Sequence, residues 1–410
     1  MRKENLTTNS RENKPHIAMY IGSLQKGGAE RVMTNLAVYF HEQGYRVSLV
    51  TTYLAPVEYE VKHAAWKVVP AGYEGAELVC DPDENPAWVD PLGNEKNGIR
   101  RYFSALLKSE QEGRIKNFKK RSDKLSAIWK KLSPDLILSF IGKNNIMALS
   151  TATKEGFKVV VSVRADPYME YNTMALRSGM LATFGKAAGI IVQTNDAKKF
   201  FPPHIRKKCT ILPNAINPSF LRRRFIDERE GSIVMVGRLD ENKNHTMVME
   251  AFSEVLKKGF GSMILKIYGD GPDRIKLQRK AIELGIDKNV QFLGMVSNVA
   301  EYIEKADLFV LASKQEGMPN ALIEAMALGL PCISTDCPCG GPRDLITDGE
   351  NGLLIPVDDV KALEAAMLRI LGDKEFAEKL GKNAARVQEK YSPDASNKMW
   401  EKYFEGILKR

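Results

Sequence analysis

No uninterrupted apolar run in the sequence approaches the roughly 18 residues of a membrane-spanning helix, so no transmembrane segment is predicted. Residues 1–15 are polar and lack the apolar centre of a signal peptide, so we expect a disordered tail and a cytoplasmic protein. Cysteine is scarce, and an odd number of five thiols fits a reducing compartment rather than a disulfide framework. Cys337-Pro-Cys339 has no second Cys or His pair at zinc-finger spacing, so zinc is the weaker alternative and we predict no metal site.

The charge of the chain is unevenly distributed. Its 410 residues are enough for two domains of ordinary size, and 44% hydrophobic and 27% charged residues are typical of a soluble globular protein. The net charge is +9, and eleven Lys or Arg against three acids give +8 between Arg100 and Lys131 alone. Apolar residues recur in this basic segment (residues 100–131) at helical spacing, which predicts one or two amphipathic helices with a basic outer face.

Three interpretations of the basic segment remain open. A solvated charged face is at least as well supported as any other. The second is attraction to an anionic inner leaflet or to a phosphorylated lipid substrate. Nucleic acid is third, since no aromatic-basic sheet motif or helix-turn-helix pattern accompanies the charge. We therefore expect an anionic membrane surface, and no nucleic acid, as the partner of residues 100–131.

The first half of the chain alternates strands with helices. A strand at residues 16–21 is followed by a Gly-rich turn and a helix, the order that opens a doubly wound α/β unit. Gly27-Gly28 lacks the G-x-G-x-x-G spacing of a dinucleotide site, but backbone without Cβ allows a phosphate or sugar to come close. Further strands are expected at residues 46–50, 135–140, 158–163, 189–193 and 209–212.

A second α/β series follows a polar, turn-rich stretch at residues 222–231, the candidate linker. We expect two Rossmann-like domains, at residues 16–218 and 219–391, with a cleft between the carboxyl ends of their strands. Residues 392–410 predict a final helix with enough apolar surface to dock, returning to the N-terminal domain. The expected strands of the second series are 232–236, 263–268, 290–293, 308–311, 332–334 and 352–355.

Residues 73–98 are rich in Pro, Gly and acids and predict an irregular excursion. It contains Asp81-Pro-Asp83, a formal match to a D-x-D metal-binding motif. We discount the match, because three residues coincide often by chance and no clear strand precedes these ones.

Two glutamates, Glu316 and Glu324, straddle a predicted strand-to-helix turn. The apolar run at residues 307–313 predicts a buried strand, and apolar residues recur at helical spacing from residue 321 on. Ionised carboxylates accept hydrogen bonds from ribose or sugar hydroxyls and repel a second anion. The pair therefore suits the hydroxyl-rich parts of a ligand.

The turn between the glutamates predicts a seat for a phosphate. Pro319 fits a helix start, where its missing N–H costs nothing. The amides of Asn320, Ala321 and Leu322 would then face outward at the positive end of the helix dipole. A phosphate between two carboxylates suggests a nucleotide sugar.

Arg238 and Lys243 follow the first strand of the second series, in Gly237-Arg-Leu-Asp-Glu-Asn-Lys243. Two fixed cations at a strand end can neutralise a departing diphosphate and stabilise charge that grows in the transition state. Either cation alone has a plain interpretation as a surface residue, but their coincidence with the glutamate pair favours a site.

With these motifs, the chain resembles the retaining family 4 glycosyltransferases of GT-B fold (glycosyl transferases group 1) over about residues 16–410. It is similar, more narrowly, to bacterial enzymes that add hexose or N-acetylhexosamine in surface-polysaccharide or lipid-linked oligosaccharide assembly. The motifs that carry the general resemblance are the E-x7-E pair Glu316 and Glu324, the G-R-L-x-x-x-K set Gly237, Arg238 and Lys243, Gly269-Asp-Gly-Pro272, Leu212-Pro-Asn214 and Asn351-Gly-Leu-Leu354. The narrower one is carried by Gly27-Gly-Ala-Glu-Arg31, Val163-Arg-Ala-Asp-Pro167, Val192-Gln-Thr194 and Cys337-Pro-Cys-Gly-Gly-Pro-Arg343.

The resemblance implies a role for each matching residue. Glu324 would hold the donor ribose, and Glu316 would contact the transferred sugar. Arg238 and Lys243 would bind the diphosphate, together with Gly237 and the amides of residues 320–322. Gly28 would approach the donor phosphate or the acceptor from the first domain, and Met295 would lie along the base. The family binds its nucleotide without an essential metal, so no cofactor is expected beyond the donor.

One departure from the family pattern concerns a histidine. Many members place one in the loop after the strand at residues 135–140, but none of the five histidines falls there. Any role in orienting the sugar would pass to Lys143, Asn144 or Asn145, or be absent. Arg164 and Asp166 follow another strand end and are predicted acceptor-side contacts, with a structural ion pair as the competing explanation.

We therefore expect a retaining transferase that moves a hexose or N-acetylhexosamine from a UDP-sugar to a lipid-linked or polysaccharide acceptor. Residues 16–218 would be the acceptor side and residues 219–391 would bind the nucleotide sugar. We expect it to act in cell-surface glycan biosynthesis, peripheral on the cytoplasmic face of the membrane. A nucleotide-sugar epimerase of the same fold and a non-catalytic nucleotide-sugar-binding or scaffold protein are the alternatives. The sequence does not identify the sugar, the acceptor or the linkage.

Overall fold

The computed structural model describes residues 14–24, 27–52, 67–70, 111–222 and 229–410. It divides into two compact units. The N-terminal unit contains Met1–Val192, Phe201–Thr210 and Trp400–Arg410, and the C-terminal unit contains Gln193–Phe200 and Ile211–Met399. These units differ from the expected ranges mainly at Gln193–Phe200, which follow a strand of the first sheet but pack in the C-terminal unit. The Asp81-Pro-Asp83 motif, the excursion at residues 73–98 and residues 100–110 of the basic segment lie outside the described residues.

The N-terminal unit is built on a seven-stranded sheet of order β3-β2-β1-β4-β5-β6-β7. Its β1 is buried at every position and pairs in parallel with β2 and β4. All six strands expected here are confirmed, whereas β3 was not predicted. The strands are β1 (His16–Ile21), β2 (Arg46–Thr51), β3 (Lys67–Pro70), β4 (Leu136–Phe140), β5 (Val159–Ser162), β6 (Gly189–Val192) and β7 (Cys209–Ile211).

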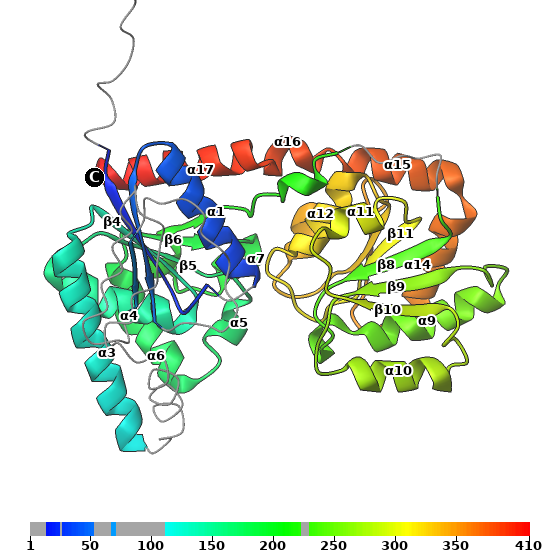
Figure 1. Ribbon diagram of the computed structural model, residues 1–410, viewed down its shortest axis with the longest axis horizontal. Coiled ribbons are helices and arrows are strands. Elements are labelled where there is room, and N and C mark those ends of the chain that lie inside the picture. Colours follow the sequence, from blue (N-terminus) through cyan, green and yellow to red (C-terminus); the bar gives the residue numbers. More distant parts are fainter. Residues whose placement is uncertain (1–13, 25–26, 53–66, 71–110, 223–228) are drawn as a thin grey trace, which may run out of the picture. The chain divides into compact units, whose positions relative to one another are not determined.

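Helices cover the faces of this sheet (Figure 1). The predicted helix after the Gly-rich turn is α1, and the basic segment forms one long helix, α3, over its described part. Buried Leu125 and Trp129 hold α3 on the unit, and the Trp129 indole donates to Thr151 Oγ1 at 2.9 Å. The helices are α1 (Gly28–Glu42), α3 (Gln111–Leu132), α4 (Gly142–Ala152), α5 (Pro167–Glu170), α6 (Met174–Thr183) and α8 (Pro203–Arg206), with short 3-10 turns at Thr153–Glu155 and Phe184–Lys186.

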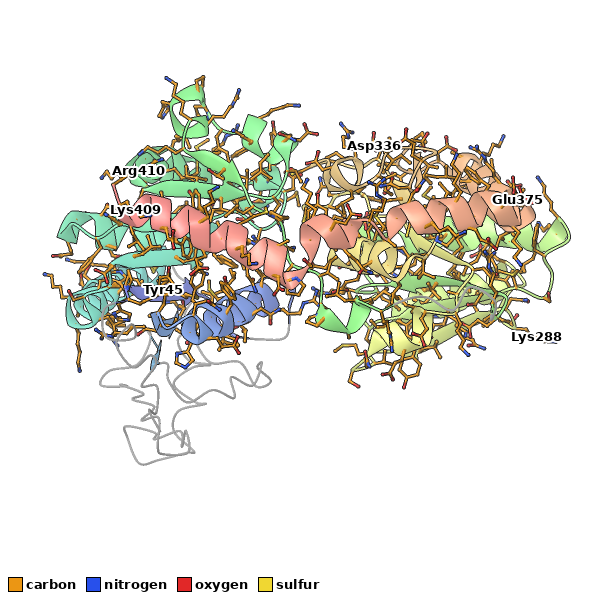
Figure 2. The ribbon with its side chains drawn as sticks, turned by 90° about the horizontal axis from the view of Figure 1, so that it is seen from above. Tyr45, Lys288, Asp336, Glu375, Lys409 and Arg410 are labelled. Atoms are coloured by element: carbon orange, nitrogen blue, oxygen red, sulfur yellow. The ribbon has the colours of Figure 1, made fainter. Side chains whose placement is uncertain are left out.

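The last helix, α17 (Pro393–Leu408), ends on the N-terminal unit, as the fold prediction requires. Phe404 is fully buried and stacks on Phe40 of α1 with ring centroids 5.0 Å apart. Trp400 packs edge-on against Phe404. Figure 2 labels Lys409 and Arg410, the two residues that follow this helix in the N-terminal unit. These contacts complete the N-terminal core with residues from the far end of the chain.

The C-terminal unit is built on a six-stranded sheet of order β10-β9-β8-β11-β12-β13, whose neighbouring strands pair in parallel. All six predicted strands are confirmed. Apolar side chains from both faces form its core with the surrounding helices (Figure 1). The strands are β8 (Ser232–Val236), β9 (Ile264–Tyr268), β10 (Val290–Gly294), β11 (Leu308–Leu311), β12 (Cys332–Thr335) and β13 (Leu353–Ile355).

The helices of the C-terminal unit follow these strands in alternation. Most are amphipathic segments with one buried face, as the periodicity of the sequence indicates. They are α7 (Asn195–Lys199), α9 (His245–Lys257), α10 (Arg274–Glu283), α11 (Val299–Ile303), α12 (Asn320–Leu328), α13 (Gly341–Leu345), α14 (Val360–Gly372), α15 (Lys374–Ala384) and α16 (Val387–Tyr391), with 3-10 turns at Pro218–Phe220 and Glu241–Lys243.

Two glycines let the loops after β8 and β9 pack backbone against backbone. Gly269 has φ +133°, and a Cβ there would lie 1.9 Å from the carbonyl oxygen of Gly237. A Cβ on Gly271 would lie 2.3 Å from the carbonyl oxygen of Leu239. The loop after β8 is further held by the Leu239 amide, which donates to Asp270 O at 3.1 Å. Glycine is therefore required at residue 269 to keep residues 237–239 in place.

The docking of α17 predicts a large effect of Phe404→Ala. Loss of a fully buried ring should lower the free energy of unfolding by about 3–5 kcal/mol. Lys402→Ala, at an exposed position of the same helix, should change it by less than about 0.5 kcal/mol. Urea unfolding measures both, and equal values for the two variants would contradict the docking.

Gly269→Ala should destabilise the C-terminal unit through the collision with Gly237. Gly259→Ala is a matched control, because Gly259 also has a positive φ of +100° but nothing lies within 4 Å of its added Cβ. The control should cost about 1–2 kcal/mol of backbone strain alone. Gly269→Ala should cost about 1–3 kcal/mol more from the overlap. Equal urea midpoints for the two variants would contradict this prediction, because residues 237–239 would then move aside without a cost in stability.

Candidate active site

The loop after β11 places Glu316 beside Lys243. The Lys243 ammonium donates to Glu316 Oε1, and the Ser313 hydroxyl donates to the same oxygen at 2.7 Å. Both charged side chains are largely buried, with 21% of Lys243 and 13% of Glu316 exposed. Because both bonds fall on Oε1, the other carboxylate oxygen is the one that remains for a hydroxyl of a ligand.

The backbone on either side of Glu316 is also fixed. Its amide donates to Pro338 O at 2.7 Å, and its carbonyl accepts from the Cys339 amide at 2.9 Å. Asn242, next to Lys243 in the chain, accepts from the Gln315 amide at 3.1 Å and donates to the Gln315 carbonyl at 3.0 Å. Thus the loop after β8 and the loop after β12 hold the Glu316 loop from two sides.

Arg238 has a different environment from Lys243. Its side chain is 71% exposed, and its nearest acid is Asp240, with a 3.8 Å separation between Nε and Oδ2. Gly237, at the end of β8, packs against the Lys243 side chain, whose Cε would lie 3.3 Å from a Cβ at that position. Arg238 is therefore a cation in solvent contact close to the buried Lys243, available to an anionic ligand.

Helix α12 carries the second glutamate and the expected phosphate seat. Glu324 is 5% exposed and lies within the nine-residue helix. The helix begins at Asn320 after Pro319, as predicted. One expected amide is not available: Leu322 N donates to Pro319 O at 3.1 Å. The phosphate seat predicted from three amides is corrected to the amides of Asn320 and Ala321, because the first turn closes on Pro319.

The electrostatics around Lys243 and Glu316 affect two neighbouring side chains. Burial, and then the charge of Glu316, raise the pKa of the Cys337 thiol to about 12, so the thiol stays protonated. Burial, and then the charge of Lys243, lower the pKa of His245 to about 4. His245 is 2% exposed at the start of α9 and is therefore neutral at physiological pH.

Met295, expected along the base, follows β10 and is 76% exposed. Gly28, expected to approach the donor, is the exposed first residue of α1 in the N-terminal unit. The structure contains nothing that tests these two roles, which stay predictions.

Arg164 and Asp166 are both buried in the N-terminal unit. The Arg164 guanidinium lies over the rings of Phe140 and Trp400, 4.9 and 5.9 Å from their centroids. Burial lowers its pKa to about 10. Asp166 caps α5 by accepting from the Tyr168 amide at 2.9 Å. Each side chain thus has a structural function, and its acceptor role stays a prediction.

Sequence reasoning missed Glu170, which organises the expected acceptor side. Its carboxylate accepts the amides of Gly142 at 2.9 Å and of Arg164 and Ala165 at 2.7 Å each. Burial raises its pKa, although these amides oppose the rise. The carboxylate fixes the start of α4 to the loop after β5. A glutamate just after an Asp-Pro helix start gives no signal for contacts this distant in sequence.

The loop in which many family members have a histidine joins β4 to α4 in the N-terminal unit. Ile141 has φ +73° and α4 starts immediately after it. Asn144 is half-buried and donates to Phe140 O at 3.2 Å, while Lys143 is exposed. Asn145 is fully buried and donates to Ser162 O at 2.9 Å. Lys143 and Asn144 are the two of these side chains that a ligand can reach.

Within the described ranges, no group of three or more His, Cys, Asp or Glu side chains is placed to hold a metal ion. The Cys339 thiol is buried and lies 3.2 Å from the Thr194 hydroxyl. The expected absence of a metal stays a prediction.

Part of the C-terminal unit matches a known protein family. The family Glycosyl transferases group 1 matches residues 218–387. Over 379 residues, 90% of this chain and 92% of the relative, the chain is 29% identical to an alpha-1,4-N-acetyl-D-galactosaminyltransferase of Campylobacter jejuni, named for a diNAcBac-PP-undecaprenol-linked substrate. It is 31% identical over 225 residues, 54% of its length, to an exopolysaccharide phosphotransferase of Streptomyces coelicolor, but spans only 24% of that protein.

Solved structures share the fold over nearly the whole chain. A sucrose-phosphate synthase from Thermosynechococcus elongatus aligns with a TM-score of 0.74 at 19% identity, covering 96% of this chain and 99% of that one. HepE from Anabaena, solved in complex with UDP, aligns with a TM-score of 0.72 at 14% identity, covering 96% and 100%. The two parallel sheets and these alignments show a GT-B fold, and residues 218–387 of the chain match the glycosyl transferases of group 1.

Proposed function

We propose that the protein is a retaining glycosyltransferase that moves a hexose or N-acetylhexosamine from a UDP-sugar to a lipid-linked or polysaccharide acceptor in cell-surface glycan biosynthesis. The observation that carries the proposal is the contact of Lys243 with Glu316 at the ends of two neighbouring strands, β8 and β11, directly before α12. A cation, an oriented carboxylate and a helix start together match the parts of a nucleotide sugar.

The donor diphosphate is assigned to the cationic side of this arrangement. Lys243 and the exposed Arg238 supply positive charge, and the amides of Asn320 and Ala321 lie at the positive end of α12. Charge that accumulates on the leaving diphosphate is stabilised by groups already in place, which is the largest contribution in many enzymes. No cofactor or metal is needed for this part of the reaction.

The carboxylates are assigned to the hydroxyl-bearing parts of the donor. Glu324, buried in α12, accepts the ribose hydroxyls, and Glu316 accepts a hydroxyl of the transferred sugar through the oxygen that Lys243 and Ser313 leave open. Lys243 and Ser313 orient the Glu316 carboxylate through its Oε1. In this role Glu316 aligns the sugar and stabilises positive character at its anomeric carbon, and it is not a nucleophile.

Retention follows from attack on the face that the diphosphate leaves. The acceptor hydroxyl oxygen bonds to the anomeric carbon while the bond from that carbon to the diphosphate oxygen breaks. The electron pair goes to the diphosphate oxygen, which also takes the proton of the hydroxyl. The transition state has oxocarbenium character, so the nearby carboxylate of Glu316 favours it.

The names of the relatives support the acceptor class. The Campylobacter jejuni relative is named for a substrate linked to undecaprenol diphosphate, and a relative from Erwinia amylovora is named for amylovoran biosynthesis. An acceptor of this kind carries a lipid or a polymer at one end and a free hydroxyl at the other.

We assign the basic segment to the membrane surface. In its described part, α3 presents Lys119 and Arg121 to solvent beside Phe118, whose ring is 47% exposed. Basic side chains next to an exposed aromatic ring match the headgroup region of an anionic bilayer. Of the helices that the structure describes, none has the combination of length and apolar character needed to span a bilayer.

Glu316→Gln and Glu324→Gln should separate catalysis from binding. Glu324→Gln should weaken UDP binding about 10- to 100-fold, because a charged acceptor to the ribose is lost. Glu316→Gln should bind UDP nearly as wild type but turn over about 100-fold more slowly. Calorimetry and UDP release with a panel of UDP-sugars and lipid-linked acceptors measure the two effects, with exposed Glu375→Gln as the control. Unchanged UDP affinity and turnover in both variants would refute the assignment, and sugar isomerisation without acceptor would favour an epimerase.

The membrane assignment predicts a loss of liposome binding in the double variant Lys119→Glu/Arg121→Glu. Each basic residue near an anionic surface contributes about 1 kcal/mol, so the partition constant should fall at least about 30-fold. Lys379→Glu/Lys382→Glu, exposed on α15, is the charge-matched control. Sedimentation with vesicles of graded phosphatidylserine content measures the change. Binding that ignores anionic lipid and salt would leave α3 as a solvated face.

A further inference from the structure

Gln193 and Thr194 form hydrogen bonds to residues that support both parts of the candidate donor site, Asn214 and Met318 beside the start of α12 and Cys339 beside Glu316. They are the first residues after β6 and belong to the C-terminal unit, whereas β6 ends at Val192 in the N-terminal unit. Both are buried, with 3% of Gln193 and none of Thr194 exposed. We propose that Gln193 and Thr194 are positioning residues of the donor site, one for the phosphate seat and the other for Glu316. The proposal rests on the function proposed above.

Thr194 acts on the Glu316 loop. Its hydroxyl donates to Cys339 O at 2.7 Å, and the amide of the same Cys339 donates to Glu316 O at 2.9 Å. The preceding residue, Pro338, accepts the Glu316 amide at 2.7 Å. Thr194 therefore fixes the peptide that holds the backbone of Glu316 from both sides.

Gln193 acts on the start of α12. Its amide nitrogen donates to Asn214 Oδ1 at 3.0 Å, and Asn214 in turn donates to Asn320 Oδ1 at 2.7 Å. The side-chain oxygen of Gln193 accepts from the backbone amide of Met318 at 3.4 Å. Asn320 is the first residue of α12 and contributes one of the two amides of the phosphate seat. Gln193 and Asn214, both buried, thus set the position of the seat.

Helix α7 and its partners make this arrangement rigid. The amide of Asn195 donates to Asp344 Oδ2 at 3.2 Å, and Asp196 pairs with Arg343 at 3.5 Å. A Cβ on Gly340, which has φ +79°, would lie 2.6 Å from Asp196 Oδ2. These contacts fix the loop after β12 at several other points, so removing one hydroxyl should act locally, on the backbone bonds of Glu316, and not on distant parts.

The consequences for the reaction differ between the two residues. A shift of Glu316 misaligns the sugar and the developing charge, and small displacements from a reactive geometry have large effects on rate. Of the groups assigned to UDP, such a shift affects only Lys243, and it leaves Arg238, Glu324 and the amides of α12 in place. A shift of Asn320 moves an amide assigned to the diphosphate and therefore weakens the binding of UDP. Two adjacent residues should therefore give two separable defects.

Hydrogen exchange tests the contacts without any substrate. In Thr194→Val, which keeps the shape but loses the hydroxyl, the amides of Glu316 and Cys339 should exchange about fivefold faster than in wild type. Thr194→Ser should restore wild-type exchange. Because the Thr194 hydroxyl also caps α7 by accepting from Ala197 N, Thr173→Val serves as the control that removes a threonine cap elsewhere, on α6.

Kinetics and calorimetry then test the positioning. Thr194→Val should lower kcat about tenfold with the UDP Kd within about twofold of wild type, and Thr194→Ser should recover most of the rate. Gln193→Met, of similar length without the amide, should raise the UDP Kd about tenfold. A uniformly loosened unit would lower the thermal midpoint and change both parameters together.

Two results would overturn the proposal. One is wild-type exchange at Glu316 and Cys339 in Thr194→Val. The other is a parallel loss of kcat and UDP affinity in both variants, without rescue by serine. Failure of the proposed function looks different, since wild type itself would then show no turnover of any UDP-sugar, while the exchange experiment would still decide on the contacts.

Discussion

The ion pair of Lys243 and Glu316 is the interaction around which the candidate site of the C-terminal unit is arranged. Taking two charges out of water costs several kcal/mol per ion, and their attraction compensates only if geometry and additional hydrogen bonds are good. The structure meets that condition with Ser313 on the same carboxylate oxygen and with backbone bonds on both sides of Glu316. A pair held in this way keeps one charge in a fixed direction, which a flexible surface pair cannot do.

Holding the pair in place accounts for features that look unrelated in the sequence. Gly269 is needed because the loop carrying Lys243 packs on it through Gly237. Gly341 is needed because a Cβ there would lie 1.5 Å from the carbonyl oxygen of Gly317, next to Glu316. Each glycine is a consequence of bringing loop backbones into contact at the ends of the strands. The fold class brings the strand ends together, and the close contacts between the loops fix the positions of Lys243 and Glu316.

Much of the fold followed from local patterns, because buried parallel strands are short apolar runs between helical periodicities. All twelve expected strands formed, as did the helix start at Pro319 and the last helix. β3 escaped because Lys67–Pro70 is short and ends in proline, which weakens the strand signal. The contact of Lys243 with Glu316 could be anticipated because both side chains lie in loops that follow β8 and β11, and neighbouring strand ends meet at one edge of a sheet.

Contacts distant in sequence could not be found in the same way. Nothing local indicates that Thr194 reaches Cys339, or that Glu170 collects three amides from two loops. Hydrophobic periodicity indicates which face of a helix or strand is buried, but it does not identify the segment that packs against that face. Both missed residues are polar, and they lie just after a strand (Thr194) or at the end of a short helix (Glu170), where backbone groups of neighbouring loops need hydrogen-bond partners. Polar residues at such positions are therefore the ones to test first as supports of a site, ahead of further charged residues on its surface.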